Sequence, residues 1–305
     1  MVQFYEVYDD LEEKIAQNFG RTKEMFDDDC KTVQEWMKSQ PHLPEIMDLN
    51  CIKNYLIYNK CSVEITKQKI DLYYTVLPKM LSLFDNVNPR LPNMRKVMDA
   101  LYFLPLPKLT PDLSRVYIYK IRDPKLSLEL SAYDTSAHII FYGEIHHHES
   151  LQLSHTFILD CSNFAPEHFK NFVPSLFQKM MVFYKKTLKL RVKNVYVVNL
   201  SAFAFKVFEM CKVFLGSKIV KKVCFCDNLV ELCDKIPKNV LPVDFGGEEK
   251  SLEEINDLLK LKYLEYQDRF DQVEAMKVAK NLRPYKLDND DFLGFYGNFK
   301  KLELD

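Results

Sequence analysis

The stretch that decides the fold runs from residue 190 to residue 226 and reads LRVKNVYVVNLSAFAFKVFEMCKVFLGSKIVKKVCFC. Residues 195–198 and 223–225 are short runs of β-branched, aromatic and other apolar residues, which are typical of buried strands. Between them, residues 202–215 carry apolar side chains at helical spacing and predict a helix. Two short strands joined by a helix indicate a βαβ unit, in which the strands are parallel.

The same alternation continues toward the N-terminus. Strands are predicted at residues 116–121 and 156–159, and helices at residues 132–147 and 172–186. Short apolar runs that alternate with helices favour a largely parallel sheet with flanking helices. The expected fold class is therefore α/β.

The N-terminal part of the chain has helical periodicity. Helices are predicted at residues 28–40, near residues 51–56 and at residues 63–81, the last with a buried side formed by Ile65, Ile70, Tyr73, Tyr74 and Leu77. Pro89 and Pro92, and the LPLP sequence at residues 104–107, predict linkers between this helical module and a larger domain. A long charged helix at residues 252–280 and an aromatic tail at residues 284–305 are expected to follow.

Composition excludes several classes of protein. The chain has 305 residues, 47% of them hydrophobic, and a formal net charge of −1, as expected for a soluble globular protein. Its 7 glycines form no G-x-G-x-x-G, G-x-x-x-x-G-K or G-x-S-x-G motif, so dinucleotide loops, phosphate loops and nucleophile elbows are excluded. The 8 cysteines form no C-x-x-C pair, and neither a secretory leader nor a membrane-spanning run is visible. We therefore expect a reduced, cytoplasmic protein.

Charge is distributed unevenly along the chain. Eleven basic residues and a single acid, Glu209, lie between Lys179 and Lys222, whereas the first thirty residues hold nine acids and three bases. Such a basic block favours a positive face for an anionic partner. The alternative is a set of solvated lysines on separate surfaces.

The sequence indicates a catalytic or metal-binding site only weakly. His146, His147 and His148, with His155 and Cys161 downstream, could form a metal cluster, but three adjacent helical imidazoles point in different directions, so we expect a polar helix end. For the remaining candidates, buried packing is expected for Cys224 and Cys226 and a structural role for Asp160. We expect no enzymatic activity, no metal and no cofactor.

The helix predicted at residues 202–215 is apolar on nearly every side. Phe203, Val207, Met210 and Phe214 form one stripe, and Phe205 lies outside it. A surface helix needs only one apolar stripe, so this helix is either buried all round or contacts something hydrophobic on its outer side. Lysines flank it in sequence, and membrane contact would use both properties.

Several of these segments resemble the CRAL-TRIO lipid-binding family. The resemblance rests on LRVKNVYVVN (190–199), KIVKKV (218–223) and IPKNVLPVDFGG (236–247), and upstream on WMKSQPHLP (36–44) and KQKIDLYY (67–74). FYGNFKKL (295–302) is similar to invertebrate members of the tocopherol-transfer and retinaldehyde-binding branch. The resemblance implies an acidic segment at 1–27, a helical module at 28–90, a lipid-binding domain at 91–250 and a C-terminal helix and tail at 251–305.

The resemblance also implies roles for individual residues. A gate helix would carry Phe203, Val207, Met210 and Phe214. An apolar ligand cavity would be lined by Ser136, Ile140, Leu159, Phe172, Met180, Phe183, Tyr184, Leu188, Val192 and Val207. A phosphoinositide headgroup would contact Arg191, Lys193, Lys218 and Lys222, all within the basic block.

The chain departs from the family pattern at several positions. Lys189, Ser201 and Val213 replace prolines, and Leu190 replaces a glutamate of the phosphatidylinositol-transfer branch. Ile139 and Gly143 replace pocket serines of the tocopherol carrier, so the resemblance does not establish tocopherol as the cargo.

The resemblance implies a monomeric cytosolic carrier that binds a tocopherol, retinoid, carotenoid or terpenoid and acts peripherally at phosphoinositide-containing membranes, without nucleic acid. The alternative is a lipid-sensing scaffold that recruits a protein partner to membranes and transfers nothing; an enzyme such as an esterase is a more distant alternative.

Overall fold

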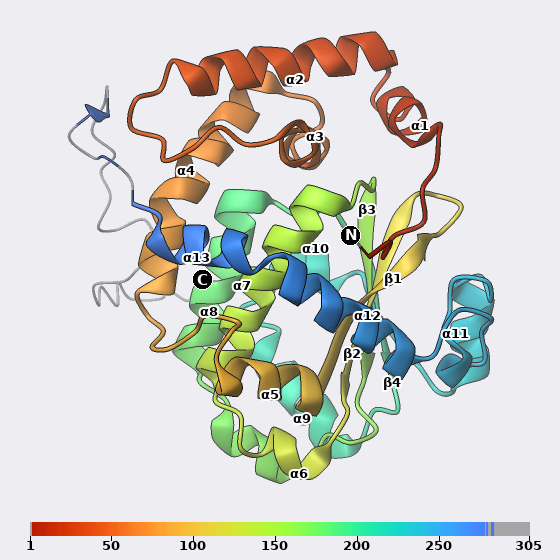
Figure 1. Cartoon of the computed structure of the whole chain (residues 1–305). Coiled ribbons are helices and arrows are strands. Elements are labelled where there is room, and N and C mark those ends of the chain that lie inside the picture. Colours follow the sequence, from red (N-terminus) through yellow and green to blue (C-terminus); the bar gives the residue numbers. More distant parts are fainter. Residues whose placement is uncertain (1, 278, 280–281, 284–305) are drawn as a thin grey trace, which may run out of the picture.

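The computed structural model describes residues 2–277, 279 and 282–283. One five-stranded sheet has the order β1 (Leu101–Leu109), β2 (Ser114–Ile121), β3 (Ser154–Asp160), β4 (Val192–Val198) and β5 (Val223–Cys226). β1 is antiparallel to β2, and the other neighbours are parallel (Figure 1). The α/β class and the largely parallel sheet are confirmed.

Helices connect the parallel strands in chain order. α7 (Ala132–Glu149) joins β2 to β3, α8 (Pro174–Phe183) joins β3 to β4, and α9 (Ala202–Cys211) joins β4 to β5. Short helices lie between them: α6 (Pro124–Ser127), a 3₁₀ turn (Pro166–Asn171) and α10 (Ser217–Val220). Because parallel crossovers are right-handed and each strand is added on the same side, these helices belong on one face of the sheet.

Side-chain contacts agree with this arrangement. Tyr142 of α7 packs against Phe103 of β1 and Tyr117 of β2, with ring centroids 5.3 and 6.3 Å apart. On the opposite face, the Lys120 ammonium of β2 lies 5.7 Å from the Phe245 ring centroid. Phe245 belongs to the segment after α11 (Leu229–Lys235), so this segment closes the second face.

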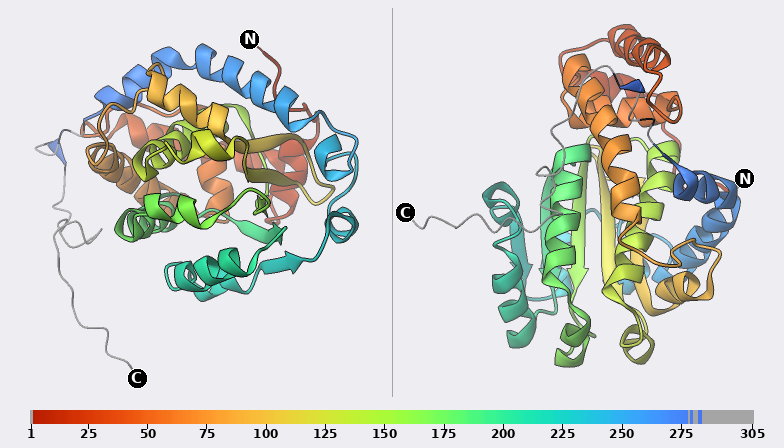
Figure 2. Two further views of the ribbon diagram at one scale, coloured as in Figure 1. Left: turned by 90° about the horizontal axis from the view of Figure 1, so that it is seen from below. Right: turned by 90° about the vertical axis from the view of Figure 1, so that its left-hand side faces the viewer.

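The N-terminal helices lie at one end of the sheet (Figures 1 and 2). They are α1 (Leu11–Gln17), α2 (Lys23–Lys38), α3 (Leu49–Tyr58) and α4 (Val63–Leu81). The Thr22, Asp48 and Ser62 side chains each accept a hydrogen bond from a backbone N–H in the first turn of α2, α3 and α4. The Thr22 cap explains why α2 begins five residues before its predicted start. Ile65, predicted to be buried, is exposed in the first turn of α4.

The predicted linker at residues 104–107 is wrong, because these residues belong to β1. Proline lacks the N–H that a central strand donates, but β1 lies at the edge of the sheet and pairs only with β2 among the described strands. The register shifts between Pro105 and Leu109, where the prolines interrupt the ladder. Pro92 begins α5 (Pro92–Ala100), where its fixed φ is favourable.

The long C-terminal helix predicted at residues 252–280 is also wrong in its extent. Two helices, α12 (Leu252–Glu265) and α13 (Gln267–Ala275), meet at Tyr266, whose backbone leaves the helical region. The change in direction lets Tyr263 stack on His138 and Phe270 pack against Phe141, both on α7. The aromatic tail predicted at residues 284–305 lies outside the described residues.

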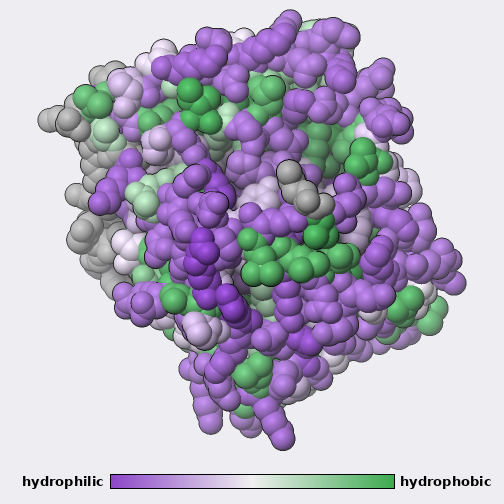
Figure 3. Space-filling view, viewed as in Figure 1, coloured by the Kyte–Doolittle hydropathy of each residue, from purple (hydrophilic) through white to green (hydrophobic). Residues whose placement is uncertain are grey.

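The face of the molecule on which α12 and α13 lie is mainly hydrophilic, and its hydrophobic side chains form separate small areas (Figure 3). Within the described part of the chain, no helix is both long enough and apolar enough to cross a membrane.

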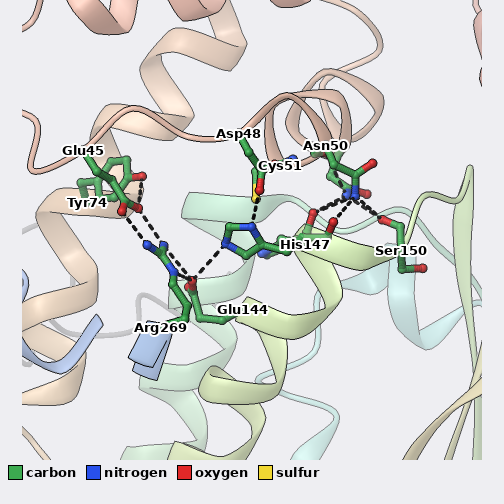
Figure 4. A network of polar contacts seen from close by, with 11 residues as sticks. Glu45, Asp48, Asn50, Cys51, Tyr74, Glu144, His147, Ser150 and Arg269 are labelled. Carbon is green, nitrogen blue, oxygen red and sulfur yellow. Dashed lines mark hydrogen bonds and ion pairs between the residues drawn. The ribbon is translucent and has the colours of Figure 1, made fainter. Parts of the chain in front are cut away.

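Arg269 links α13 to the N-terminal helical module and to α7 (Figure 4). Its guanidinium makes two hydrogen bonds to Glu45, of 2.5 and 2.7 Å, and one of 2.9 Å to Glu144 of α7. The Tyr73 and Tyr74 hydroxyls of α4 donate to Glu144 and Glu45. Burial opposes ionisation of Glu45, but the hydrogen bonds from Arg269 hold its pKa below the ordinary value. This network joins the helical module, α7 and α13.

We predict that Arg269→Met lowers the free energy of unfolding by about 3 kcal/mol, because it leaves two poorly solvated carboxylates without their cation. Arg90→Met is the matched control. Arg90 also pairs with α13, through Asp271 at 2.7 Å, but its side chain is half exposed, so a loss below about 1 kcal/mol is expected. Urea unfolding measures both, and equal losses would contradict the role given to Arg269.

Candidate ligand-binding site

An open pocket of about 1070 Å³ lies where β2, β3 and β4 begin. Its lining is strongly basic, with Asp112 as the acidic member and seven cationic side chains: Lys14, Lys60, Lys189, Arg191, Lys193, Lys218 and Lys222. The four residues predicted to contact a phosphoinositide headgroup all line this pocket. That they bind such a headgroup stays a prediction.

Strand order brings the domain's cations together. Arg191 and Lys193 lie at the start of β4, and Lys222 immediately precedes β5. Because β4 and β5 are parallel neighbours, their starts share one edge of the sheet. The Lys222 ammonium donates to the backbone carbonyl of Val192, and Lys193 forms an ion pair with Asp112.

Arg191 is half buried, whereas Lys193 and Lys218 are exposed. Its guanidinium carbon lies 4.9 Å from the Phe19 ring centroid, which favours a cation–π contact. Burial lowers the pKa of this guanidinium. Among the described residues no carboxylate lies within ion-pair distance of it, so a half-buried positive charge faces the pocket without an acidic partner.

The crossover face of the sheet is incompletely covered. In the central strand β3, Ile158 on the opposite face is 0% exposed, whereas Phe157 and Leu159 on the crossover face are only half buried. On α7, a Cβ built on Gly143 would meet no atom within 4 Å. An apolar surface between packed layers is therefore left partly accessible.

α9 is the least buried of the crossover helices. Only Ala204 of its ten residues is buried, so the alternative of burial all round is wrong. Phe205 is 43% exposed, and Val213, which follows the helix, is 76% exposed. The helix ends at Cys211, so Phe214 of the predicted gate stripe lies beyond it.

Aromatic contacts hold α9 over the sheet. Phe203 contacts Phe164 and Phe169, before α8, with centroids 5.8 and 6.2 Å apart. Phe214 contacts Phe177 of α8 at 5.9 Å. The sequence did not predict a contact with α9 for Phe164, Phe169 and Phe177, because their spacing fits neither a strand nor one helix face. The inner side of α9 therefore rests on a few phenylalanines.

The ten predicted lining residues do not share one environment. Val192 lines the basic pocket. Phe183 is buried against Tyr73 of α4, with centroids 6.2 Å apart. The others divide by burial: Ile140, Met180 and Leu188 are buried, and Ser136, Leu159, Phe172, Tyr184 and Val207 are half buried. Their role as cavity lining stays a prediction.

The prediction that His146, His147 and His148 form a polar helix end is wrong for the first two. His146 and His147 are buried, and they lie near His155, which is 2% exposed. Burial lowers the pKa of His147 to about 4 and that of His155 to about 3, so both are neutral at physiological pH. His146 contacts the Tyr117 hydroxyl and Gln152, so aromatic and amide neighbours replace water around it.

Donor atoms suited to a metal come within 4.8 Å of one another at Asp48, Cys51 and His148 in the described part of the chain. These groups already bond to one another: Asp48 accepts from the Cys51 backbone N–H at 2.8 Å and pairs with the His148 ring. Burial raises the pKa of the Cys51 thiol well above its ordinary value, which keeps the thiol protonated. The contacts within this cluster therefore link the start of α3 to α7.

Two further candidates have structural environments. Asp160 accepts hydrogen bonds from Lys120, Asn199 and the Ser162 backbone, in agreement with a structural role. Cys226 is buried as predicted, but Cys224 is exposed, because β5 is an edge strand.

Comparison with known proteins identifies two domains. The family model described as "Pinta-like, UBA domain" matches residues 22–94, and that described as "CRAL/TRIO domain" matches residues 102–247. The comparison with curated proteins gives no match. Among solved structures, the crystal structure of Sfh5 matches 85% of this chain and 100% of its own, with 11% identity and a TM-score of 0.48. The two domains, in this order, show that the chain belongs to the CRAL-TRIO family of lipid-binding proteins.

Proposed function

We propose that this protein is a carrier for a small hydrophobic molecule of tocopherol, retinoid, carotenoid or terpenoid type. The cargo binds between the crossover face of the sheet and α9. The observation that carries this proposal is the half-buried pair Phe157 and Leu159 in the central strand, beside a fully buried Ile158. Removing such apolar surface from water contributes about 25 cal/mol per Å², so a hydrophobe gains by covering it.

α9 is the gate in this proposal. Its inner residues, Phe203 and Val207, are four positions apart and therefore share one helix face. Met210 shares this face and is 39% exposed, whereas Phe205 lies on another face, packs against Phe225 of β5 with ring centroids 5.8 Å apart and is still 43% exposed. A helix that is apolar on both sides can contact cargo inside and a bilayer outside. Release at a membrane then requires separating only a few aromatic contacts.

The basic pocket directs the carrier to its membrane. Lys218 and Lys222 follow α9 along the chain, so the cationic residues and the exposed apolar residues belong to one continuous segment. Anionic phosphoinositide headgroups would be attracted by the pocket while the bilayer receives α9. The carrier role requires no catalytic group.

We predict that Val207→Trp lowers cargo binding about tenfold or more, because the larger side chain occupies the space under α9. Overpacking costs about 1–3 kcal/mol, so the fold is expected to survive. Native mass spectrometry after gentle purification, followed by titration with a fluorescent retinoid or tocopherol, measures binding. Val230→Trp is the control, because Val230 is exposed on α11. A wild-type protein that takes up no hydrophobe would favour the scaffold alternative.

We also predict that Lys218→Glu with Lys222→Glu slows cargo transfer to phosphoinositide-containing vesicles at least about 30-fold. Each basic group near an anionic surface contributes about 1 kcal/mol, and two are lost. The salt dependence of transfer should weaken as well, because the attraction is screened within about 8 Å at physiological ionic strength.

The control for this pair is Lys125→Glu with Lys238→Glu, which makes the same charge change at exposed positions outside the pocket. Hydrophobe binding in solution should be retained in both double variants. Equal transfer rates for the two, with and without phosphoinositide, would argue against the pocket as the membrane-directing site.

A further inference from the structure

A cluster of oxygen, sulfur and nitrogen donors lies where the start of α3 meets the end of α7. It consists of Asp48, Cys51 and His148, whose donor atoms come within 4.8 Å of one another in the described part of the chain. The three residues line a second cavity, of about 160 Å³, which shares no lining residue with the basic pocket. The expectation of no metal considered adjacent histidines. Here only His148 takes part, and Asp48 lies 100 residues away in sequence.

Helix geometry places Asp48 and Cys51 side by side. Asp48 is the N-cap of α3 and Cys51 is the third residue of the helix, two positions whose side chains face each other in a capping box. One Asp48 oxygen accepts the Cys51 backbone N–H at 2.8 Å, and the other faces Nδ1 of His148. The Asn50 amide donates to the carbonyls of His147 and His148 and so holds α3 against α7 (Figure 4). Contacts that need no metal therefore fix the positions of the donors.

The His148 ring lies between two carboxylates. Its Nδ1 atom faces Asp48, whereas its Nε2 atom lies 4.0 Å from Oε2 of Glu144. Nε2 is buried and has no hydrogen-bond partner among the described residues. A histidine that binds a metal ion through one nitrogen usually turns its other N–H toward a carboxylate or a carbonyl. Glu144 is already in the place of that outer partner.

The charges of the cluster suit a divalent cation. Burial, and the Asp48 carboxylate beside it, raise the pKa of the Cys51 thiol, so the thiol keeps its proton as long as no ion is bound. A metal ion takes the place of that proton, which leaves for the solvent. One thiolate and one carboxylate then balance the two positive charges, and the imidazole is a neutral third ligand. The C-terminal end of α7, to which His148 belongs, also favours a positive charge.

We propose that Asp48, Cys51 and His148 bind Zn²⁺. Zn²⁺ accepts a mixed set of sulfur, nitrogen and oxygen ligands, whereas Mg²⁺ and Ca²⁺ are bound through oxygen. The second cavity leaves the fourth position to a water molecule. α3 and α7 belong to the regions matched by the two family models, so the ion ties the helical module to the lipid-binding domain. This inference does not depend on the carrier role.

Cobalt titration of the reduced, metal-free full chain tests the site. Co²⁺ substitutes for Zn²⁺, and a thiolate ligand gives it a charge-transfer absorption in the near ultraviolet. We expect one Co²⁺ per chain with this absorption, displaced by an equivalent of Zn²⁺ but not by an excess of Mg²⁺. Absence of the absorption, or its loss in Mg²⁺, would overturn the proposal.

Cys51→Ser and His148→Gln each remove one ligand. Each should weaken Zn²⁺ binding at least about tenfold in isothermal titration calorimetry, because even the outer partners of metal ligands contribute about 10–100-fold. Cys30→Ser, at another buried thiol of the helical module, and Cys224→Ser, at the exposed thiol of β5, are the controls and should bind as the wild type does. Wild-type affinity in both ligand variants would overturn the assignment, and so would an absorption that disappears in Cys224→Ser.

The urea midpoint of unfolding separates metal binding from packing. An ion that binds only the folded chain stabilises it, so Zn²⁺ should raise the midpoint of the wild type and a chelator should reverse the rise. The midpoints of Cys51→Ser and His148→Gln should not respond to Zn²⁺, even where lost packing lowers them. The His148 side chain is 22% exposed, so His148→Gln keeps the test valid if Cys51→Ser fails to fold. A rise in the ligand variants equal to that of the wild type would contradict the site.

Discussion

The handedness of three consecutive crossovers determines where this protein can bind a ligand. Strands β2 to β5 are added one after another in the same direction, so right-handed connections place α7, α8 and α9 on one face of the sheet. α9 is the last of these helices, and β5 beneath it is the edge strand. α9 therefore has a neighbouring crossover helix on one side only. The helix at the open side of this layer is the one that can move with the fewest contacts broken.

The parallel order also explains why basic residues that are distant in sequence lie together. Every parallel strand starts at the same edge, so basic residues just before β4 and β5 converge there although thirty residues separate them. The apolar residues of α9 lie between these two basic segments in sequence. The basic residues that flank the apolar helix in sequence thus meet in one cationic pocket, while the helix itself keeps exposed apolar residues. Such a combination suits the interface between water and an anionic bilayer.

Local periodicity predicted much of this fold. The strands at residues 116–121, 156–159, 195–198 and 223–225 were recognisable because β-branched and aromatic residues form short runs there. β1 was missed because Pro105 and Pro107 are incompatible with a central strand, and sequence alone does not show which strand is at the edge. The histidines near residue 147 were misjudged for a similar reason. Their burial depends on Tyr117 and on α3, which are distant in the chain.

The candidate site was predictable only in part. Lys14 and Lys60 could not be assigned to the pocket from the sequence, because they reach it through packing of the N-terminal helices against the domain. Arg191, Lys193, Lys218 and Lys222 could be named from a family resemblance, since they flank strands whose order the family shares. Val192 was expected in an apolar cavity but lines the basic pocket, because its position at the start of β4 places it near the strand edge.

The scarcity of glycine leaves left-handed backbone positions to other residues. With 7 glycines in 305 residues, only Gly20 and Gly246 take up left-handed positions in the described chain, while six such positions are held by other residues: Lys60, Cys61, Asn86, Leu113, Lys189 and Asn199. The two asparagines tolerate this conformation, because their short polar side chains can bond locally. Lysine has no such property, and its long side chain brings no local hydrogen bond to offset the backbone cost. Both lysines instead follow the end of a helix, where the Lys60 N–H bonds to the Ile57 carbonyl at 3.2 Å and the Lys189 N–H bonds to the Tyr184 carbonyl at 2.8 Å, so their left-handed backbone terminates these helices.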